Sequence, residues 1–304
     1  MRIIISIFSI FICASVFTQQ HPLVGQYNYN EMIINPASTG DNGALQGLLS
    51  WRQQWVGVEG APSVKNFSIQ SPLKKRPNAS IGLLAYSDKI GVSSQNGAFI
   101  NYAYQLKINK SSQLRFGIAG GAIFNRSLYS QLELTDKEDP NFTENTPRFV
   151  TPNFSVGVKY FIKDFSLGIS IPTILSASYN SGGYTSITND FGSYNIITSL
   201  KYKIKLSEKL ALSPSALFKY HVSNKDQIDF MATLNLDDRH DIGLGYRTYE
   251  GLLMHFKIGI NDQFSVGAQY EIPMSTLSTY KASTFEILIL YNALFKTNAA
   301  SPRF

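Results

Sequence analysis

Cysteine, charge and long apolar runs are all scarce in this chain of 304 residues. Cys13 is its only cysteine, 16% of its residues are charged, and only residues 3–17 form a continuous apolar run. Soluble globular proteins carry roughly 25% charged residues. A transmembrane helix needs about 20 consecutive apolar residues, and disulfides need paired cysteines. The sequence therefore excludes a disulfide-stapled fold and a bundle of transmembrane helices.

Aromatic residues, in contrast, are abundant: they make up 13% of the chain and are mostly tyrosine and phenylalanine. The mean hydropathy is −0.07, close to neutral. This combination is typical of β-strands that have one apolar and one polar face. The formal net charge is +6. Lysine and arginine are nevertheless scattered along the chain rather than gathered into a stripe, so no nucleic-acid partner is expected.

The first residues have the pattern of an export signal. Arg2 precedes the apolar run, and the polar residues 18–21 follow it. Signal peptides combine a basic start with an apolar stretch of roughly 7–15 residues and a cleavage site. We therefore expect a signal peptide at residues 1–19, which would be removed from the mature protein. A buried N-terminal strand or helix is the alternative reading.

Beyond this segment, apolar and polar residues alternate. In residues 164–171, for example, Leu167 and Ile169 alternate with Ser166 and Gly168. Successive side chains of a strand point to opposite faces, so the first pair is expected on an apolar face and the second on a polar one. Similar segments predict fourteen strands, at residues 44–55, 62–71, 79–88, 97–108, 113–126, 152–162, 164–174, 195–206, 209–221, 227–236, 239–248, 251–260, 263–272 and 281–293.

The connections between these segments differ in length by parity. Those after the even-numbered strands are brief and polar, whereas the alternate set includes two long ones, residues 127–151 and 175–194, and only Glu250-Gly251 is tight there. Outer-membrane barrels have short periplasmic turns and longer extracellular loops. We therefore predict an all-β fold, a transmembrane antiparallel β-barrel of about 14 strands with both termini at the periplasmic rim. A soluble β-sandwich is the alternative, since it gives the same alternation.

This topology divides the chain into four parts. After the signal peptide, residues 20–43 are expected to form a periplasmic segment or a plug of the barrel. Residues 44–293 are expected to form the barrel, and residues 294–304 a periplasmic tail. A barrel of this size is wide enough to need a plug or to leave a pore.

No pattern of residues predicts an enzyme, a metal site or a cofactor. The histidines have no spacing that suits a metal site or a base with its partner. The glycines of residues 117–121 lack a phosphate-binding pattern and are expected to allow a bend or close packing within a strand. Four acidic residues lack the spacing of a calcium loop and are expected in a solvated loop. They are Asp136, Glu138, Asp139 and Glu144.

Two stretches near the N-terminus do not alternate and combine aromatic, amide and turn residues. The first, residues 26–40, contains an Asn-Pro pair, which signals a turn or an extended chain. The second, residues 51–62, holds both tryptophans and reads WRQQWVGVEGAP. Tryptophan and arginine are typical of binding hot spots, but the tryptophan pair also suits the aromatic girdle of a barrel with Arg52 paired inside the lumen, and both readings stay open. The candidate residues are Asn35, Pro36, Trp51, Arg52, Gln53, Gln54, Trp55, Gly57, Gly60 and Pro62.

These stretches resemble the opening of the PorP/SprF family of outer-membrane proteins from Bacteroidetes. The resemblance rests on the sequences NPASTG, WRQQWVGVEGAP and SIQSPL, and it continues at residues 88–91, 152–154, 167–172 and 301–304. One departure is Phe285-Glu286-Ile287, where the family often has His-Glu-Ile.

The resemblance implies a role in type IX secretion, and in gliding motility for some members. It also implies an outer-membrane location, with membrane lipid, other secretion-system components and a secreted adhesin or surface protein as partners. No catalytic residues are carried over. A passive or substrate-specific channel is the alternative function.

Overall fold

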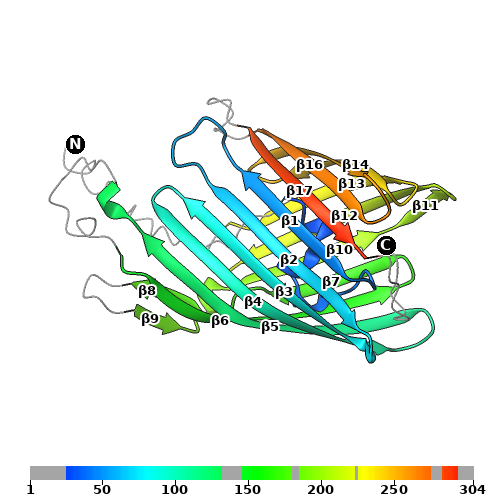
Figure 1. The fold of residues 1–304 in the computed structure, drawn as a ribbon, viewed down its shortest axis with the longest axis horizontal. Helices are drawn as coiled ribbons and strands as arrows, with labels where there is room; N and C mark the ends of the chain where they lie inside the picture. Colours follow the sequence, from blue (N-terminus) through cyan, green and yellow to red (C-terminus); the bar gives the residue numbers. More distant parts are fainter. Residues whose placement is uncertain (1–24, 132–145, 180–184, 223–224, 275–282, 294–304) are drawn as a thin grey trace, which may run out of the picture.

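The computed structural model describes residues 25–131, 146–179, 185–222, 225–274 and 283–293, which form a closed antiparallel barrel of 14 strands (Figure 1). Helical structure in these residues is limited to short 3-10 turns. None of the described helices combines the length and the apolarity that crossing a bilayer requires. The expected signal peptide, the C-terminal tail and the four clustered acidic residues lie outside the described residues.

The strands of the wall follow one another around the barrel. They are β1 (Gln46–Gln53), β2 (Ser63–Leu73), β3 (Arg76–Ile90), β4 (Ser93–Lys107), β5 (Ser112–Ser127), β6 (Phe149–Ile162), β7 (Phe165–Ile171), β10 (Asn195–Tyr202) with its continuation β11 (Ile204–Ser207), β12 (Leu210–His221), β13 (Gln227–Leu236), β14 (His240–Arg247), β15 (Gly251–Gly259), β16 (Phe264–Pro273) and β17 (Thr284–Asn292). A separate hairpin, β8 (Ser176–Tyr179) with β9 (Thr185–Thr188), lies between β7 and β10.

The first and last strands close the ring. β1 pairs with β17 along its whole length, from Gln46 opposite Asn292 to Gln53 opposite Phe285. β10 pairs with β7 on one side and with β12 on the other, so the wall has no break there. Closure leaves no open edge between the first and the last strand of the wall, as a membrane requires. The predicted barrel is confirmed, and the β-sandwich is excluded.

The alternation of side chains gives the wall an apolar outside and a polar inside. On β6, Phe154 is 51% exposed on the outer face, whereas Asn153 and Lys159 on the inner face are almost fully buried. On β7, Ile169 is 50% exposed and Ser166 is buried. These outward apolar side chains form the surface that membrane lipid covers. The faces predicted from the sequence are therefore confirmed.

The two rims of the barrel differ in their connections. At one rim, here called the short-turn rim, each pair of strands is joined by two to four residues, as at β6–β7. At the other, the long-loop rim, the connections include residues 54–62, 128–148 and 172–194. This sorting agrees with the parity in the sequence. That the short-turn rim faces the periplasm remains a prediction.

One connection at the long-loop rim is much shorter than expected. The sequence predicted that β3 ends at residue 88, that β4 begins at residue 97, and that Glu250-Gly251 is the only tight connection on this side. β3 instead continues to Ile90 and β4 begins at Ser93, so Gly91 and Val92 alone make the turn. Gly91 has a φ of +56°, which glycine adopts without steric cost. The polar residues 93–96, which the sequence predicts as part of a loop, instead pair with β3 as the start of β4.

Candidate functional site

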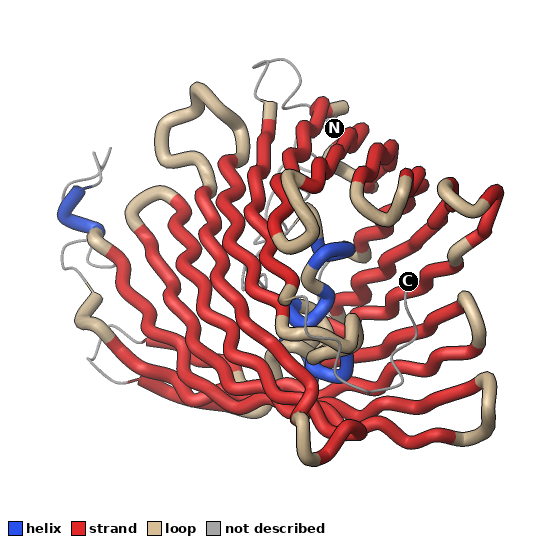
Figure 2. The backbone as a smooth tube through the Cα atoms, turned by 45° about the vertical axis from the view of Figure 1, so that its right-hand side comes forward, coloured by secondary structure: helices blue, strands red, loops and turns tan. Residues whose placement is uncertain are grey.

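The segment before β1 lies inside the barrel. Residues 25–43, here called the plug segment, form three 3-10 turns, η1 (Tyr27–Tyr29), η2 (Glu31–Ile33) and η3 (Pro36–Ser38). Figure 2 shows these turns within the ring of strands. Asn35 caps the third turn, because its side-chain oxygen accepts a hydrogen bond of 2.9 Å from the Ala37 amide, and proline suits the first helical position.

The plug segment runs along the barrel from one half to the other. Gly25 lies near the long-loop rim, where its amide donates a 2.7 Å hydrogen bond to Glu286 near the start of β17. Gly40 lies near the short-turn rim, where its amide donates to Gln70 near the end of β2. β1 begins and β17 ends at the short-turn rim as predicted, but the chain before β1 turns back into the barrel.

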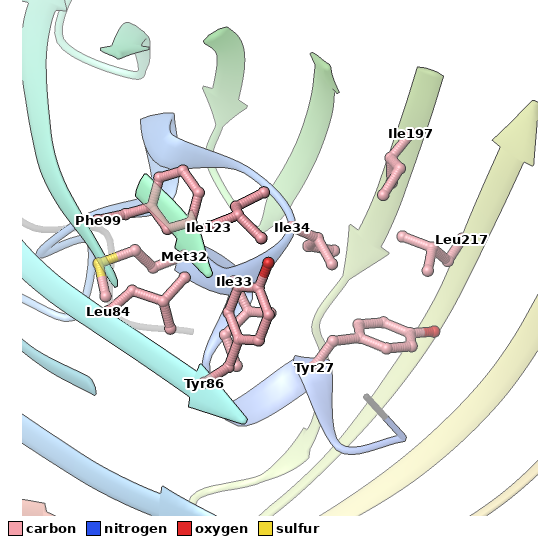
Figure 3. Close-up of a cluster of buried hydrophobic side chains, with 10 residues drawn as sticks. All are labelled: Tyr27, Met32, Ile33, Ile34, Leu84, Tyr86, Phe99, Ile123, Ile197 and Leu217. Carbon is pink, nitrogen blue, oxygen red and sulfur yellow. The ribbon is translucent and has the colours of Figure 1, made fainter. Parts of the chain in front are cut away.

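The middle of the plug segment packs into an apolar cluster with residues of the wall. Met32, Ile33 and Ile34 are almost fully buried against wall residues (Figure 3). Burying one such side chain stabilises a fold by about 1.5–3 kcal/mol. The cluster consists of Tyr27, Met32, Ile33, Ile34, Leu84, Tyr86, Phe99, Ile123, Ile197 and Leu217.

Glycines on the inner face of the wall leave room for the plug segment. A Cβ atom at Gly117 would overlap the backbone of Pro36 and Ala37, and one at Gly157 would overlap the side chain of Asn35. A Cβ atom at Gly82 would overlap the Met32 sulfur. The close packing expected of the glycines at 117–121 is therefore observed for Gly117. Asn35 and Pro36, two of the candidate residues from the sequence, therefore lie in the lumen against these wall glycines.

Ion pairs hold the plug segment near the short-turn rim. The Lys159 ammonium binds two carboxylates of the segment, Glu31 and, at 2.9 Å, Asp41. The hydroxyl of Ser199 donates a 2.7 Å hydrogen bond to Glu31. The guanidinium of Arg115 donates to the carbonyl oxygens of Ala37, at 2.9 Å, and Thr39. We call Glu31, Asp41, Arg115, Lys159 and Ser199 the plug anchor.

A second group of charges lies on the inner face near the long-loop rim. Arg52 of β1 binds Glu271 of β16 through both terminal nitrogens and lies 3.6 Å from Glu286 of β17. Arg247 of β14 binds Asp229 of β13 at 2.9 Å and lies 3.4 Å from Glu271. Glu250 lies within 3.5 Å of both arginines. We call these residues the seam network, because they span the strands on both sides of the β1–β17 closure. They are Arg52, Asp229, Arg247, Glu250, Glu271 and Glu286.

The tryptophan and arginine residues singled out in the sequence do not share one surface. Trp51 lies on the outer face, 39% exposed, with its ring edge against Phe285. Arg52 is 1% exposed inside the lumen. Trp55 follows the strand at a φ of +45° and belongs to the loop of residues 54–62.

That loop is tied to its neighbours by backbone groups, while its tip is exposed. The Gln54 amide donates a 2.9 Å hydrogen bond to the carbonyl of Pro62, and Val56 donates to Ser283. Gly57 and Gly60 have φ values of +94° and +71°, which favour glycine. Gln53 is the last residue of β1 and partly buried. Whether this loop binds a partner remains a prediction.

Most residues of the two charged groups were not singled out from the sequence. For the members that lie on strands, the sequence shows only a charged residue on the polar face of the strand, as Lys159 is in residues 153–162. The signal does not tell which charges meet, because Arg52 and Glu271 are 219 positions apart. Among the described residues, no group of three or more histidine, cysteine or acidic side chains is placed to hold a metal ion.

The fold and its contents define a class, the outer-membrane β-barrel, here with a segment of its own chain inside the lumen. Within that class, the chain belongs to the PorP/SprF family, type IX secretion system membrane proteins, whose family model matches residues 16–291. The protein is therefore a membrane component of type IX secretion and resides in the outer membrane. No curated protein matches the sequence significantly.

Solved structures with a similar fold are also outer-membrane proteins. The CymD monoaromatic hydrocarbon channel is 12% identical, with 88% of this chain and 93% of that chain covered and a TM-score of 0.51. A mutant of the TodX channel is 9% identical, with coverages of 87% and 94% and a TM-score of 0.50. Omp33 of Acinetobacter baumannii is 9% identical, with coverages of 83% and 100% and a TM-score of 0.46. At these identities the likeness concerns the fold alone.

Proposed function

We propose that this protein is a plugged, non-enzymatic barrel that helps the type IX system to export, anchor or localise a secreted adhesin or another surface protein. The observation that carries the proposal is the plug segment. It occupies the lumen and is held there by an apolar cluster and by buried ion pairs. A barrel filled in this way serves better as a docking platform in the membrane than as an open pore.

The alternative, a passive or substrate-specific channel, is supported by two proteins of similar fold, CymD and TodX, which are hydrocarbon channels. The charged inner face of this barrel suits a hydrocarbon poorly, because Arg52 and Arg247 lie fully inside it. A channel function would require the plug segment to leave the lumen.

Partner binding is assigned to the loop of residues 54–62. Val56 and Val58 expose apolar side chains at the long-loop rim, next to the partly exposed Trp55. Tryptophan is among the residues most enriched in binding hot spots, and the two exposed valines extend the apolar surface beside it. Trp51 is assigned to the lipid-facing surface and Arg52 to the interior, so neither belongs to this docking site.

The test combines secretion with conductance. Deletion of the gene is expected to remove a surface adhesin, and Trp55→Ala with Val58→Ala is expected to restore the folded barrel but not the adhesin. Trp51→Ala is the matched control and is expected to restore both. The purified wild-type barrel is expected to give no steady conductance in a planar bilayer. A large steady conductance, with adhesin display unaffected by gene deletion, would contradict the proposal and favour the channel.

A further inference from the structure

One half of the short-turn rim is strongly basic. The strand ends and turns that join β2 to β3 and β4 to β5 carry exposed lysine and arginine side chains. Residues 63–127, which make up these four strands and their turns, contain a single acidic residue, Asp88, and it lies near the long-loop end of β3. The positive charge therefore has no counter-charge on this part of the rim. Its residues, here called the basic rim, are Lys74, Lys75, Arg76, Lys107 and Lys110.

The two basic turns are neighbours, because β3 leads out of one and β4 leads into the other. Ala79 of β3 pairs with Tyr104 of β4. Arg76 begins β3 and Lys107 ends β4, so each lies further toward the rim than this pair on adjacent strands. The cations of the two turns thus lie side by side and form one surface.

The other half of the same rim is balanced in charge. Lys203 lies 3.5 Å from Asp238, and Arg239 forms an ion pair with Asp262. Cations there face carboxylates of neighbouring turns, so that half presents no excess of positive charge. The charged residues between β10 and β16 at this rim are the cations Lys203, Lys205, Lys209 and Arg239 and the anions Glu208, Asp237, Asp238 and Asp262.

The basic rim lies at the border of the lipid-facing surface. Leu106 and Ile108, on either side of Lys107, are 46% and 57% exposed. Slightly further from the rim, Tyr104 pairs with Phe116, and both rings are exposed on the outer face. Aromatic side chains of barrels form girdles at the membrane interfaces. Long basic side chains there lay their stems on apolar surface and hold their charge at the level of the headgroups. This position favours a lipid over a protein in the aqueous compartment.

We propose that the basic rim binds the headgroups of anionic phospholipids, a preference that the balanced half of the rim lacks. Lysine and arginine donate charge-assisted hydrogen bonds to phosphate oxygens. Each such residue close to an anionic membrane strengthens binding about fivefold. With the short-turn rim in the periplasm, as predicted, these lipids belong to the inner leaflet of the outer membrane. The docking loop of the proposed function lies at the opposite rim, so this inference stands without it.

Two matched reporters measure the lipid preference on the two halves of the rim. Ile108→Trp places a tryptophan in the basic half, and Ile260→Trp places one in the β15–β16 turn, where the isoleucine is 65% exposed. Both are made in a Trp51→Phe and Trp55→Phe background, which removes the two native tryptophans. The barrel is held in nanodiscs of brominated phosphatidylcholine, which quenches nearby tryptophan fluorescence, and part of this lipid is replaced by unbrominated phosphatidylglycerol.

Relief of quenching gives the affinity of phosphatidylglycerol relative to phosphatidylcholine beside each reporter. At Ile108→Trp we expect phosphatidylglycerol to bind about fivefold more tightly or better, and at Ile260→Trp we expect the two lipids to bind equally. Adding Lys75→Gln, Lys107→Gln and Lys110→Gln to the first reporter should abolish the preference. The variant with arginine at the same three positions keeps the charge and should keep the preference. High salt should weaken it, because salt screens exposed charges.

Equal preference at the two reporters would overturn the proposal, and so would a preference that survives the three glutamine substitutions. Millimolar inorganic phosphate should leave the preference unchanged. Its loss under phosphate would mean that the surface binds free phosphate rather than a lipid. A polyglutamate peptide that displaces phosphatidylglycerol from the nanodisc-embedded barrel would likewise overturn the proposal and assign the surface to an acidic protein.

Discussion

The plug anchor and the seam network are both buried and charged, but they connect different parts of the molecule. In the plug anchor, Lys159 of the wall binds Glu31 and Asp41 of the plug segment. In the seam network, the ion pairs join wall strands to one another, and the plug segment adds the Gly25 amide at Glu286, together with an amide hydrogen bond from Gln26 to the Glu286 carbonyl. The plug anchor therefore fastens the plug segment to the barrel wall, whereas the seam network joins wall strands to one another where the barrel closes.

Breaking the seam network should have the largest effect on the barrel as a whole. Removing one partner of a buried ion pair leaves the other charge uncompensated and costs about 3–5 kcal/mol. We expect Arg247→Met to lower the free energy of unfolding by this amount, measured by urea titration of the barrel in lipid vesicles. The matched control is Arg239→Met, whose ion pair with Asp262 is more than half exposed and should contribute about 0–1 kcal/mol. Equal losses of unfolding free energy in both variants would show that the buried ion pairs of the seam network stabilise the barrel no more than an exposed pair does.

Breaking the plug anchor should release the plug segment and leave the wall folded. Lys159→Met leaves Glu31 and Asp41 without their cation, at a local cost of the same order, about 3–5 kcal/mol. A reporter for the plug is Ser38→Cys in a Cys13→Ser background, because Ser38 is buried in the lumen. The reporter is expected to react with a maleimide only when Lys159→Met is also present.

The control for this variant is Lys203→Met, whose 3.5 Å ion pair with Asp238 lies at the short-turn rim. It is expected to leave the reporter unreactive. If Lys159→Met unfolds the wall as readily as Arg247→Met does, the two charged groups do not have separate tasks.

A charge introduced on the outer face of the barrel provides a reference for the losses of stability expected in the interior. Arginine on the lipid face of a barrel costs roughly 2–4 kcal/mol near the bilayer midplane and about 0–1 kcal/mol near the interfaces. We expect Ile169→Arg, on the outer face of β7, to lower the free energy of unfolding by the larger amount. Ile260→Arg, in the β15–β16 turn, should have little effect. Equal tolerance at both positions would mean that β7 does not face lipid.

The smallest expected effect concerns the room left for the plug segment. Gly117→Ala places a methyl group where the backbone of Pro36 and Ala37 lies, and overpacking of this kind costs about 1–3 kcal/mol. Gly120→Ala is the matched control on the same strand, because its added Cβ atom would lie 3.6 Å from Phe154, an ordinary contact. The difference is read as increased maleimide reactivity of Ser38→Cys in the first variant only. The reverse order would mean that Gly117 does not pack against the plug.

The wall was largely predictable from the sequence, because alternation has a period of two and needs no knowledge of distant residues. The faces of β6 and β7 and the parity of the loops followed from it. The turn at Gly91-Val92 was missed because polar residues such as those at 93–96 read as a loop, although strands at a rim tolerate them. The hot-spot reading grouped Trp51 and Arg52 because they are neighbours in sequence, yet neighbours on a strand point to opposite faces, as the girdle reading with Arg52 in the lumen requires.

The interior was less predictable, because its contacts join residues far apart in the chain. Glu31 meets Lys159, and Arg52 meets Glu271, only after the ring has closed in one register. Nothing local in the sequence distinguishes a plug from a periplasmic segment. Residues 25–43 lack alternation, and the glycines that accommodate them lie on strands β3, β5 and β6.

Conductance of a cross-linked barrel tests most directly whether the plug segment closes the lumen. The variant combines Lys159→Met with Asn30→Cys and Ser68→Cys, at two side chains that hydrogen-bond at 2.7 Å between plug and wall. Oxidised, with the cross-link verified on a gel, the barrel should be silent in a planar bilayer. Reduced, it should show discrete openings. Identical conductance in the two states would contradict the account.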